Sequence, residues 1–248
     1  MKEFVKITSL TNPHIKELAK LTDSKERIKR SEVLVEGAHL VKEAYDLGIL
    51  KEVLIVDEEN YLEGVTNILV TSEIIKKLST TSTPQDILGV AKIEAKEIIF
   101  GDTILILDGV SDPGNFGTIV RSAKAFNVSS IIVAGGIDIY NEKAVRATQG
   151  AIFKMPIIRM DLKEAISLLK TKGYLIYTTA LKEAIDLEEI KVVDKYALIV
   201  GNEAKGVSDD AIRYSDKVIK IKMNKNVESL NVAVATAICI YTLNNKRK

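Results

Sequence analysis

In the first hundred residues, short apolar runs alternate with helical patterns. Between residues 10 and 30, apolar side chains recur at Ile15, Leu18 and Leu21, which predicts a helix with Asn12 as its cap and Pro13 at its first position. Further short apolar runs predict strands, and amphipathic stretches predict helices. The predicted strands are 33–35, 53–56, 68–70 and 88–93, and the predicted helices are 38–47 and 72–78.

From residue 103 onward the alternation of apolar strands and helices becomes more regular. Strands that are apolar throughout and separated by helices are typical of a mostly parallel sheet covered on both faces. We therefore predict an α/β protein with domains 1–95 and 103–248, joined by a linker at 96–102. In the second domain the predicted strands are 104–107, 131–134, 175–178, 197–200 and 218–221, and the predicted helices are 115–126, 142–150, 162–172, 209–214 and 229–243.

The charge distribution is more informative than its sum. The chain has 248 residues and a formal net charge of +1, which taken alone argues against a strongly basic nucleic-acid binder. The sum hides a net charge of +4 in residues 1–30, −7 in residues 31–100 and +4 in the remainder. The total therefore does not exclude a local basic surface.

Cysteine, histidine and hydropathy narrow the class of protein. Cys239 is the only cysteine, so an intrachain disulfide and a cysteine-based zinc site are excluded. With only His14 and His39 besides, we expect no metal site. No apolar run approaches the length of a membrane span, and the first residues lack the apolar region of a signal peptide, so we expect a cytoplasmic protein.

Two polar loops of the second domain follow predicted strands. The first runs from Asp108 to Gly117 and leads into a helix, with Asn115 as a candidate cap and Arg121 nearly two turns further on. The second contains Gly201-Asn202-Glu203, where glycine lets the backbone approach a ligand closely. Ligands bind at such strand ends in α/β sheets. The plain structural alternatives are a tight turn with a surface arginine, and a helix cap.

A third segment leads into the apolar final helix. Here Ser229 is a candidate helix cap and Asn231 is expected in the first turn, so two polar side chains open an otherwise apolar helix. The sequence contains no G-x-G-x-x-G after a strand, no G-x-x-x-x-G-K-[ST] loop and no G-x-S-x-G elbow. Spacing rules alone therefore predict a ligand-binding α/β domain and nothing more specific.

Together and in this order, the three segments resemble the signature of the SpoU/TrmH group of SPOUT RNA methyltransferases. The first matches from Asn115 to Arg121, the second as Gly201-Asn202-Glu203 with Gly206 behind it, and the third as Ile221-Lys222-Met223 followed by 229–233. The match covers about residues 103–245. One departure is Lys222, which stands where many relatives have proline.

The first hundred residues resemble the ribosomal-protein-like substrate-binding domain of the same family. The weaker matches there are Val35-Glu36-Gly37 and Thr83-Pro84-Gln85. For the second domain, the resemblance implies a SPOUT α/β fold with a deep trefoil knot, bound S-adenosylmethionine and a homodimer. It implies that the cofactor is held by Thr178, Thr179, Gly201, Asn202, Ile221, Met223 and Leu230.

The implied reaction is methyl transfer to a ribose 2′-hydroxyl of RNA. Arg121, contributed by the partner subunit, is the expected key residue; a guanidinium stays protonated, so we expect it to stabilise charge on the 2′-oxygen rather than to act as a base. The resemblance implies that Asn115, Glu203, Ser229 and Asn231 position Arg121, the ribose and the loops.

The presence of an N-terminal domain favours large-subunit rRNA over tRNA as the substrate, since shorter tRNA-modifying relatives have only brief extensions. We expect the basic start of the chain to meet RNA phosphates. The alternatives are a tRNA ribose 2′-O-methyltransferase, a non-catalytic RNA-binding factor in ribosome assembly and, poorly supported without a glycine fingerprint, a nicotinamide-dependent dehydrogenase. The candidate RNA-binding residues are Lys16, Lys20, Arg27 and Arg30.

Overall fold

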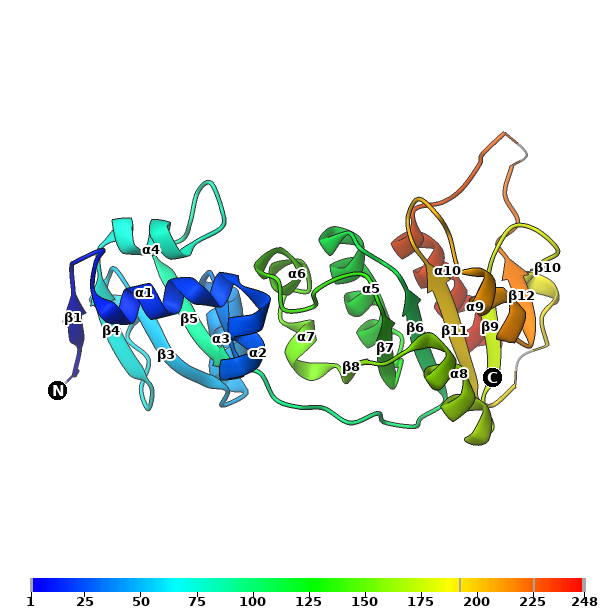
Figure 1. Cartoon of the computed structure of the whole chain (residues 1–248), viewed down its shortest axis with the longest axis horizontal. Helices are drawn as coiled ribbons and strands as arrows, with labels where there is room; N and C mark the ends of the chain where they lie inside the picture. Colours follow the sequence, from blue (N-terminus) through cyan, green and yellow to red (C-terminus); the bar gives the residue numbers. More distant parts are fainter. Residues whose placement is uncertain (1, 192, 225, 247–248) are drawn as a thin grey trace. The chain divides into compact units, whose positions relative to one another are not determined.

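The computed structural model describes residues 2–191, 193–224 and 226–246. The chain forms two compact units. The first contains the residues up to Ala95 together with Asp138–Phe153, and the second contains Lys96–Ile137 and the chain from Lys154 onward (Figure 1). The domain boundaries predicted from the sequence did not anticipate that residues 138–153 belong with the first unit.

A mixed sheet forms the centre of the first unit, with strand order β1-β4-β3-β5-β2. Strand β5 runs antiparallel to β2 and β3, whereas β1 and β3 both run parallel to β4. The edge strand β1 was not predicted, because three residues are too few to show a period. The strands are β1 Val5–Ile7, β2 Glu32–Glu36, β3 Leu50–Ile55, β4 Thr66–Val70 and β5 Ile87–Lys92.

Helices cover both faces of this sheet. Ile15 and Leu18 of α1 and Ile75 of α4 are buried against Leu54 and Leu88 of the sheet, and α3 packs against β2, β3 and β5. The long helix predicted over 10–30 is broken, because the backbone of residue 23 is extended and its carboxylate caps a new helix. The elements are α1 Pro13–Ala19, η1 Lys20–Thr22, α2 Ser24–Arg30, α3 Ala38–Asp46, η2 Glu58–Asn60, α4 Ser72–Leu78, α6 Glu142–Ala147 and the start of α7 Ala151–Lys154.

The second unit is built on a sheet whose neighbouring strands are all parallel, which confirms the predicted architecture. The strand order is β10-β12-β9-β11-β6-β7-β8, so β6 and β11 lie side by side in the middle. The short strands β8 and β10 were not predicted. The strands are β6 Thr103–Asp108, β7 Ser130–Ala134, β8 Ile157–Arg159, β9 Leu175–Thr179, β10 Ile185–Asp186, β11 Tyr196–Gly201 and β12 Lys217–Lys220.

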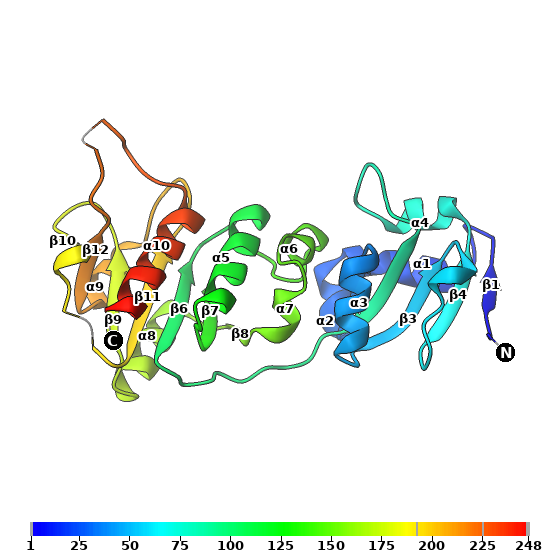
Figure 2. The same cartoon turned by 180° about the vertical axis from the view of Figure 1, so that it is seen from behind.

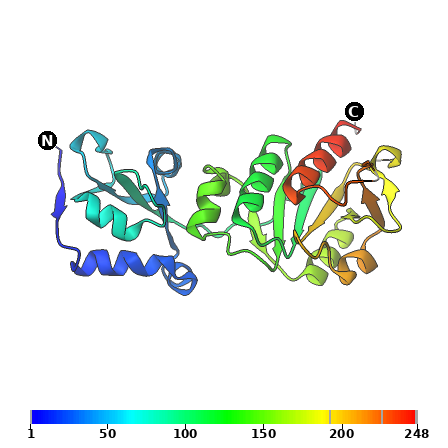
Figure 3. The same ribbon diagram turned by 90° about the horizontal axis from the view of Figure 1, so that it is seen from above.

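Two layers of helices cover this parallel sheet. Helices α5 and α10 pack side by side on one face, and α8 and α9 lie on the other (Figures 2 and 3). Alternate residues of each strand serve the two faces: Ile104 and Ile106 pack with Leu169 of α8, while Leu105 and Leu107 point the other way. The helices are α5 Pro113–Ala125, α8 Leu162–Thr171, η3 Leu187–Glu189, α9 Asp209–Tyr214 and α10 Val232–Asn245.

The caps of the two site-forming helices differ from the predicted ones. Asp112, not Asn115, caps α5, because its carboxylate accepts from the Asn115 amide at 2.7 Å. Asn231, not Ser229, caps α10 by accepting from the amides of residues 233 and 234. The trefoil knot stays a prediction. Across the described residues, none of the helices has the length and apolar character needed to span a bilayer.

Candidate functional site

The loops that carry the three motifs meet at one end of the parallel sheet. Strands β6 and β11 pair in register up to Asp108 and Gly201, so the loops that follow them start side by side. Likewise β9 and β12 pair at Thr179 and Ile219. Because parallel strands all end at the same edge, residues from distant parts of the chain are brought together there.

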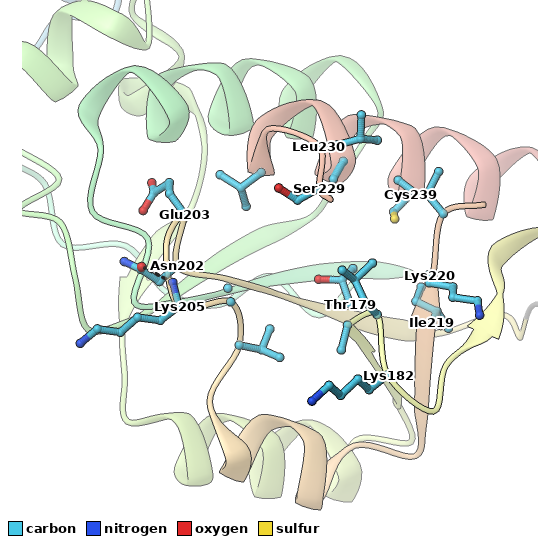
Figure 4. Close-up of a pocket in the computed structure, with 18 of the residues that line it drawn as sticks. Thr179, Lys182, Asn202, Glu203, Lys205, Ile219, Lys220, Ser229, Leu230 and Cys239 are labelled. Atoms are coloured by element: carbon cyan, nitrogen blue, oxygen red, sulfur yellow. Dashed lines mark hydrogen bonds between the residues drawn. The ribbon is translucent and has the colours of Figure 1, made fainter. Parts of the chain in front are cut away.

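A cavity of about 450 Å³ lies among these strand ends, the loop after β11 and the first turns of α10 (Figure 4). Its size falls within the range of small-molecule sites. It is lined by Thr179, Ala180, Leu181, Lys182, Gly201, Asn202, Glu203, Ala204, Lys205, Gly206, Val207, Ile212, Ile219, Lys220, Ile221, Met223, Ser229, Leu230, Val232, Ala235 and Cys239.

Six of the seven predicted cofactor residues line this cavity, and Thr178 does not. The prediction for Thr178 is corrected: its side chain is fully buried and its hydroxyl donates to the Ala211 carbonyl at 3.2 Å. Sequence reasoning missed the part of the wall that α10 contributes, Val232, Ala235 and Cys239. These recur every three or four residues on one helix face, and their place in an apolar helix predicts core packing alone.

The loop after β11 folds back on itself against the cavity. Asn202 and Gly206 exchange two backbone hydrogen bonds of 2.8 and 2.9 Å. A Cβ at position 201 would lie 2.2 Å from the carbonyl carbon of Gly206, so only glycine fits where β11 meets the returning loop. The Asn202 side chain fixes this loop to its neighbour by donating to the Gly109 carbonyl at 2.9 Å.

Glu203 binds the loop that precedes α5. Its carboxylate accepts from the Ser111 hydroxyl and the Asp112 amide, both at 3.1 Å, from the Asn115 side chain at 3.2 Å and from the Ser111 amide at 3.3 Å. Partial burial acts to raise the pKa of Glu203, but hydrogen bonds from backbone amides and the Asn115 side chain hold that pKa below its ordinary value. The carboxylate is therefore ionised at neutral pH.

Asn231 completes the connection between the three motifs. Its side-chain amide donates to the Asn115 side-chain oxygen at 2.8 Å, while its own oxygen caps α10. Asn115 is thus held between Glu203 and Asn231. Four of the five predicted catalytic residues, those at positions 115, 203, 229 and 231, lie in this network or in the cavity wall.

Arg121 lies apart from this group. It is exposed on α5 and is not among the residues that line the cavity. In the described part of the chain, its guanidinium has no hydrogen-bond or ion-pair partner. The site of one chain therefore contains the cavity and the loop network, and leaves a free cation on the neighbouring helix.

The candidate RNA-binding residues are in different environments. Lys16 is exposed, Lys20 pairs with Glu17 at 2.6 Å, and Arg30 pairs with Glu32 at 2.6 Å. The prediction for Arg27 is corrected, since its side chain is 3% exposed and forms an ion pair with Asp138. A buried, paired guanidinium is not available to an RNA phosphate.

The side chains that could bind a metal ion are scattered. Within the described ranges, no group of three or more His, Cys, Asp or Glu side chains is arranged to hold a metal ion. The site is instead an apolar cavity beside a polar loop network.

The class defined by this fold and site is an α/β protein that binds its ligand among the carboxyl-end loops of a parallel sheet. Comparison with known proteins is more specific. The SpoU rRNA Methylase family matches residues 102–241, and the MRM3-like substrate binding domain matches residues 12–89. The chain belongs to the SpoU rRNA methylase family.

Relatives match over nearly the whole chain. The chain is 36% identical to the 23S rRNA (guanosine(2553)-2′-O)-methyltransferase RlmP of Bacillus subtilis, covering 96% of this chain and 98% of the relative. It is similar to the crystal structure of an AdoMet-bound rRNA methyltransferase from Sinorhizobium meliloti, with a TM-score of 0.87, 30% identity and 98% of each chain covered. A crystal structure of an RNA 2′-O ribose methyltransferase gives a TM-score of 0.83 and 28% identity, with 98% of this chain and 99% of that chain covered.

Proposed function

We propose that this protein transfers the methyl group of S-adenosylmethionine to a ribose 2′-hydroxyl of large-subunit rRNA. The observation that carries the proposal is the meeting of the three family motifs around one cavity, with Asn115 held between Glu203 and Asn231. The relative from Bacillus subtilis, similar along both domains, supports rRNA as the substrate. That substrate in turn supports a cytoplasmic protein, as the sequence predicts.

The cavity suits S-adenosylmethionine in size and lining. Its volume is about 450 Å³, and its lining combines glycine and apolar residues with polar residues of the strand-end loops. Gly201, Ile221, Met223 and Leu230 would hold the cofactor, and Gly201 leaves no side chain in the way. When bound, the cofactor supplies an electrophilic methyl group on its sulfonium.

The residues of the chain would align the 2′-hydroxyl and stabilise charge on its oxygen. Arg121 carries a permanent positive charge, suited to hold an adjacent phosphate and the developing negative charge. Glu203 and Asn231 fix Asn115 in the first turn of the helix that carries Arg121. Ser229, at the cavity wall, would orient the ribose.

A homodimer would complete the site. On α10, the side chains of Val234, Ile238 and Tyr241 are 47%, 37% and 56% exposed and form a stripe spaced by four and three residues. This stripe lies on the helix that packs against α5, the helix of Arg121. An exposed apolar stripe on a helix is typical of a subunit contact, and through it Arg121 would reach the cavity of a second copy.

The RNA contact of the first unit is proposed to involve Lys16, Lys20 and Arg30. Lys16 is exposed, and the ion pair of Lys20 with Glu17 joins two exposed side chains. Such a surface ion pair is weak, so a phosphate can compete for Lys20. Arg30 pairs with the buried Glu32 carboxylate and would meet a phosphate only through the part of its side chain that is exposed.

The function is tested by incubating the purified protein with labelled S-adenosylmethionine and hypomethylated rRNA or tRNA. We expect label on the 2′-oxygen of one rRNA nucleotide, and loss of transfer but not of cofactor binding in Arg121→Ala. Methyl transfer to tRNA and not to rRNA would show that the protein is a tRNA methyltransferase instead. Absence of both transfer and cofactor binding would indicate a non-catalytic RNA-binding factor.

The dimer is tested by mixing Arg121→Ala with Cys239→Phe, whose cavity is obstructed, at an S-adenosylmethionine concentration too low to occupy the obstructed cavity. If Arg121 serves the partner's cavity, a mixed dimer contains one intact site and activity returns. If each chain uses its own Arg121, every site in the mixture stays defective and no activity returns.

A further inference from the structure

Residues 138–153 leave the sheet of the second unit after β7 and return to it before β8, yet they belong to the first unit. We call residues 138–153 the anchor segment. It contains α6, which packs against β2 of the first unit. Two polar attachments hold it there, one of them made by a buried arginine, and neither takes part in the site described above.

The first attachment is made by Arg27 of α2. Its guanidinium donates to the Leu21 carbonyl at 2.6 Å, forms an ion pair with Asp138 and lies 3.5 Å from the Glu142 carboxylate. Burial raises the pKa of Glu142, while the charge of Arg27 opposes that shift. Because a buried charge without a partner is strongly destabilising, Arg27 and the first residues of the anchor segment depend on each other.

The second attachment joins Glu36, at the end of β2, to Arg146 of α6. The Glu36 carboxylate accepts from the Ser79 hydroxyl at 2.5 Å, from the Thr81 hydroxyl, and from the Arg146 guanidinium at 3.2 Å. Glu36 belongs to one of the two weaker family matches of the first domain. Gln85, from the other, caps the next helix by accepting from the Ala38 amide at 2.9 Å. Of these two matches, Glu36 binds Arg146 directly and Gln85 supports the helix that follows β2.

The residues just before the anchor segment hold the loop that enters α5. The Ile137 amide donates to the Val110 carbonyl at 2.9 Å, and the Gly109 amide donates to the Ala134 carbonyl at 3.2 Å. The approach is so close that a Cβ on Gly136, whose φ is +80°, would lie 2.2 Å from the Val110 oxygen. The residues that follow in this loop, 111 and 112, are the ones that bind Glu203.

We propose that Arg27 and Glu36 are positioning residues for methyl transfer, because they fix the anchor segment whose preceding residues hold the α5 loop. Asp138, held by Arg27, follows Ile137 directly in the chain, and Ile137 is bonded to the loop. The substrate-binding unit thus restrains the chain at the residue next to the catalytic loop. This inference rests on the proposed function and adds two residues that touch neither cofactor nor RNA.

The test compares Glu36→Gln and Arg27→Met with the wild type in single-turnover methyl transfer, alongside dissociation constants for S-adenosylmethionine and RNA. Glu36→Gln keeps the oxygen used by Ser79 and replaces the one used by Arg146. We expect the transfer rate to fall about tenfold or more in both variants, with both dissociation constants within about twofold of the wild type. An unchanged rate, or a change in RNA affinity alone, would overturn the inference.

Lys51→Met is the matched control. It removes a cation from another buried carboxylate of the same unit, Glu32, without touching the anchor segment, so its rate should stay at the wild-type value. If Lys51→Met loses as much activity, the effect is general destabilisation and the inference fails.

A triple variant keeps the test decisive if Arg27→Met alone does not fold. Arg27→Met combined with Asp138→Asn and Glu142→Gln leaves no buried unpaired charge, and we expect a restored melting temperature with a rate that stays low. Recovery of the rate together with stability would overturn the inference. A wild-type protein that transfers no methyl group would instead refute the proposed function.

Discussion

Glu203 shows how a single side chain connects motifs that lie far apart in the sequence. Its two oxygens accept from two amides, a hydroxyl and a side-chain amide, all supplied by the loop before α5 or its first turn. An ionised carboxylate is the side-chain group best suited to so many donors. The motif Gly201-Asn202-Glu203 therefore has a structural function, namely to hold the neighbouring motif.

Replacing Glu203 with Gln should slow methyl transfer with little change in folding. Glutamine keeps one acceptor oxygen, but its NH2 group replaces the other oxygen and would face hydrogen-bond donors that it cannot accept from. We expect the single-turnover rate to fall about 10- to 100-fold, and the S-adenosylmethionine affinity to fall less than the rate. Rapid-quench assays and calorimetry measure the two quantities. A drop in affinity equal to the drop in rate would contradict the assigned role.

The pH dependence of the free energy of unfolding should show that the ionised form of Glu203 stabilises the fold. The pKa of Glu203 in the folded protein is lowered from its ordinary value of 4.5. The ionised carboxylate therefore contributes fully to the free energy of unfolding above pH 4.5, and this contribution is lost as the pH falls through the folded-state pKa. The difference in free energy of unfolding between wild type and Glu203→Gln should be constant from about pH 7 to about pH 5 and should narrow below. Denaturant titrations across this range provide the measurement. A difference that widens in acid would contradict the expected sign.

Cys239 offers a probe of the cavity wall. Burial raises the pKa of its thiol to about 12, so the native protein should resist alkylation until it unfolds. Cys239→Phe should fill part of the cavity and weaken S-adenosylmethionine binding by about tenfold or more, whereas Cys239→Ala should bind nearly as the wild type does. Equal affinities in the two variants would show that this residue does not border the ligand.

At the scale of elements, α10 has two apolar faces and only one of them is covered within the chain. Cys239 and Leu243 are buried against the unit, while Ile238 and Tyr241 are exposed on the opposite side. A continuously apolar helix is expected to be buried all round, so the exposed side is consistent with the subunit contact proposed above.

Ile238→Glu should produce a monomer that binds S-adenosylmethionine and transfers no methyl group. The charge would be buried at the proposed subunit contact, where it has no partner. Light scattering gives the mass, calorimetry the affinity and labelled RNA the activity. Ser167→Glu places the same charge at an exposed position of α8 and should leave the mass, the affinity and the activity unchanged. A dimeric, active Ile238→Glu protein would contradict the proposed role of the stripe.

Most elements of the fold were predictable from the sequence, because their hydrophobic periods are long enough to read. The strands β1, β8 and β10 were not, since two or three residues carry no period and gain their structure from pairing. The helix caps were shifted because Asp112 and Asn115, like Ser229 and Asn231, are all capable of capping, and only the backbone geometry selects among them. The cavity residues on α10 resemble core positions because the helix is apolar throughout, and Cys239 is in fact buried.

At the scale of the whole molecule, three of the four basic residues that the sequence predicts to meet RNA are already paired with carboxylates. Arg27 is buried, and Lys20 and Arg30 are paired. We expect RNA affinity to depend weakly on salt, with a slope of log K against log salt no steeper than about −3. Binding measured by fluorescence anisotropy between low and physiological salt gives this slope. A much steeper slope would indicate many phosphate contacts and contradict the charge argument.

The first unit is assembled from two stretches of chain that lie more than forty residues apart in sequence. During synthesis, the N-terminal stretch leaves the ribosome well before residues 138–153 are made. Until then Arg27 has no carboxylate partner and Glu36 has no guanidinium. The substrate-binding unit therefore completes its folding only after most of β6, α5 and β7 of the other unit have been translated, which reverses the usual expectation that an N-terminal domain folds first.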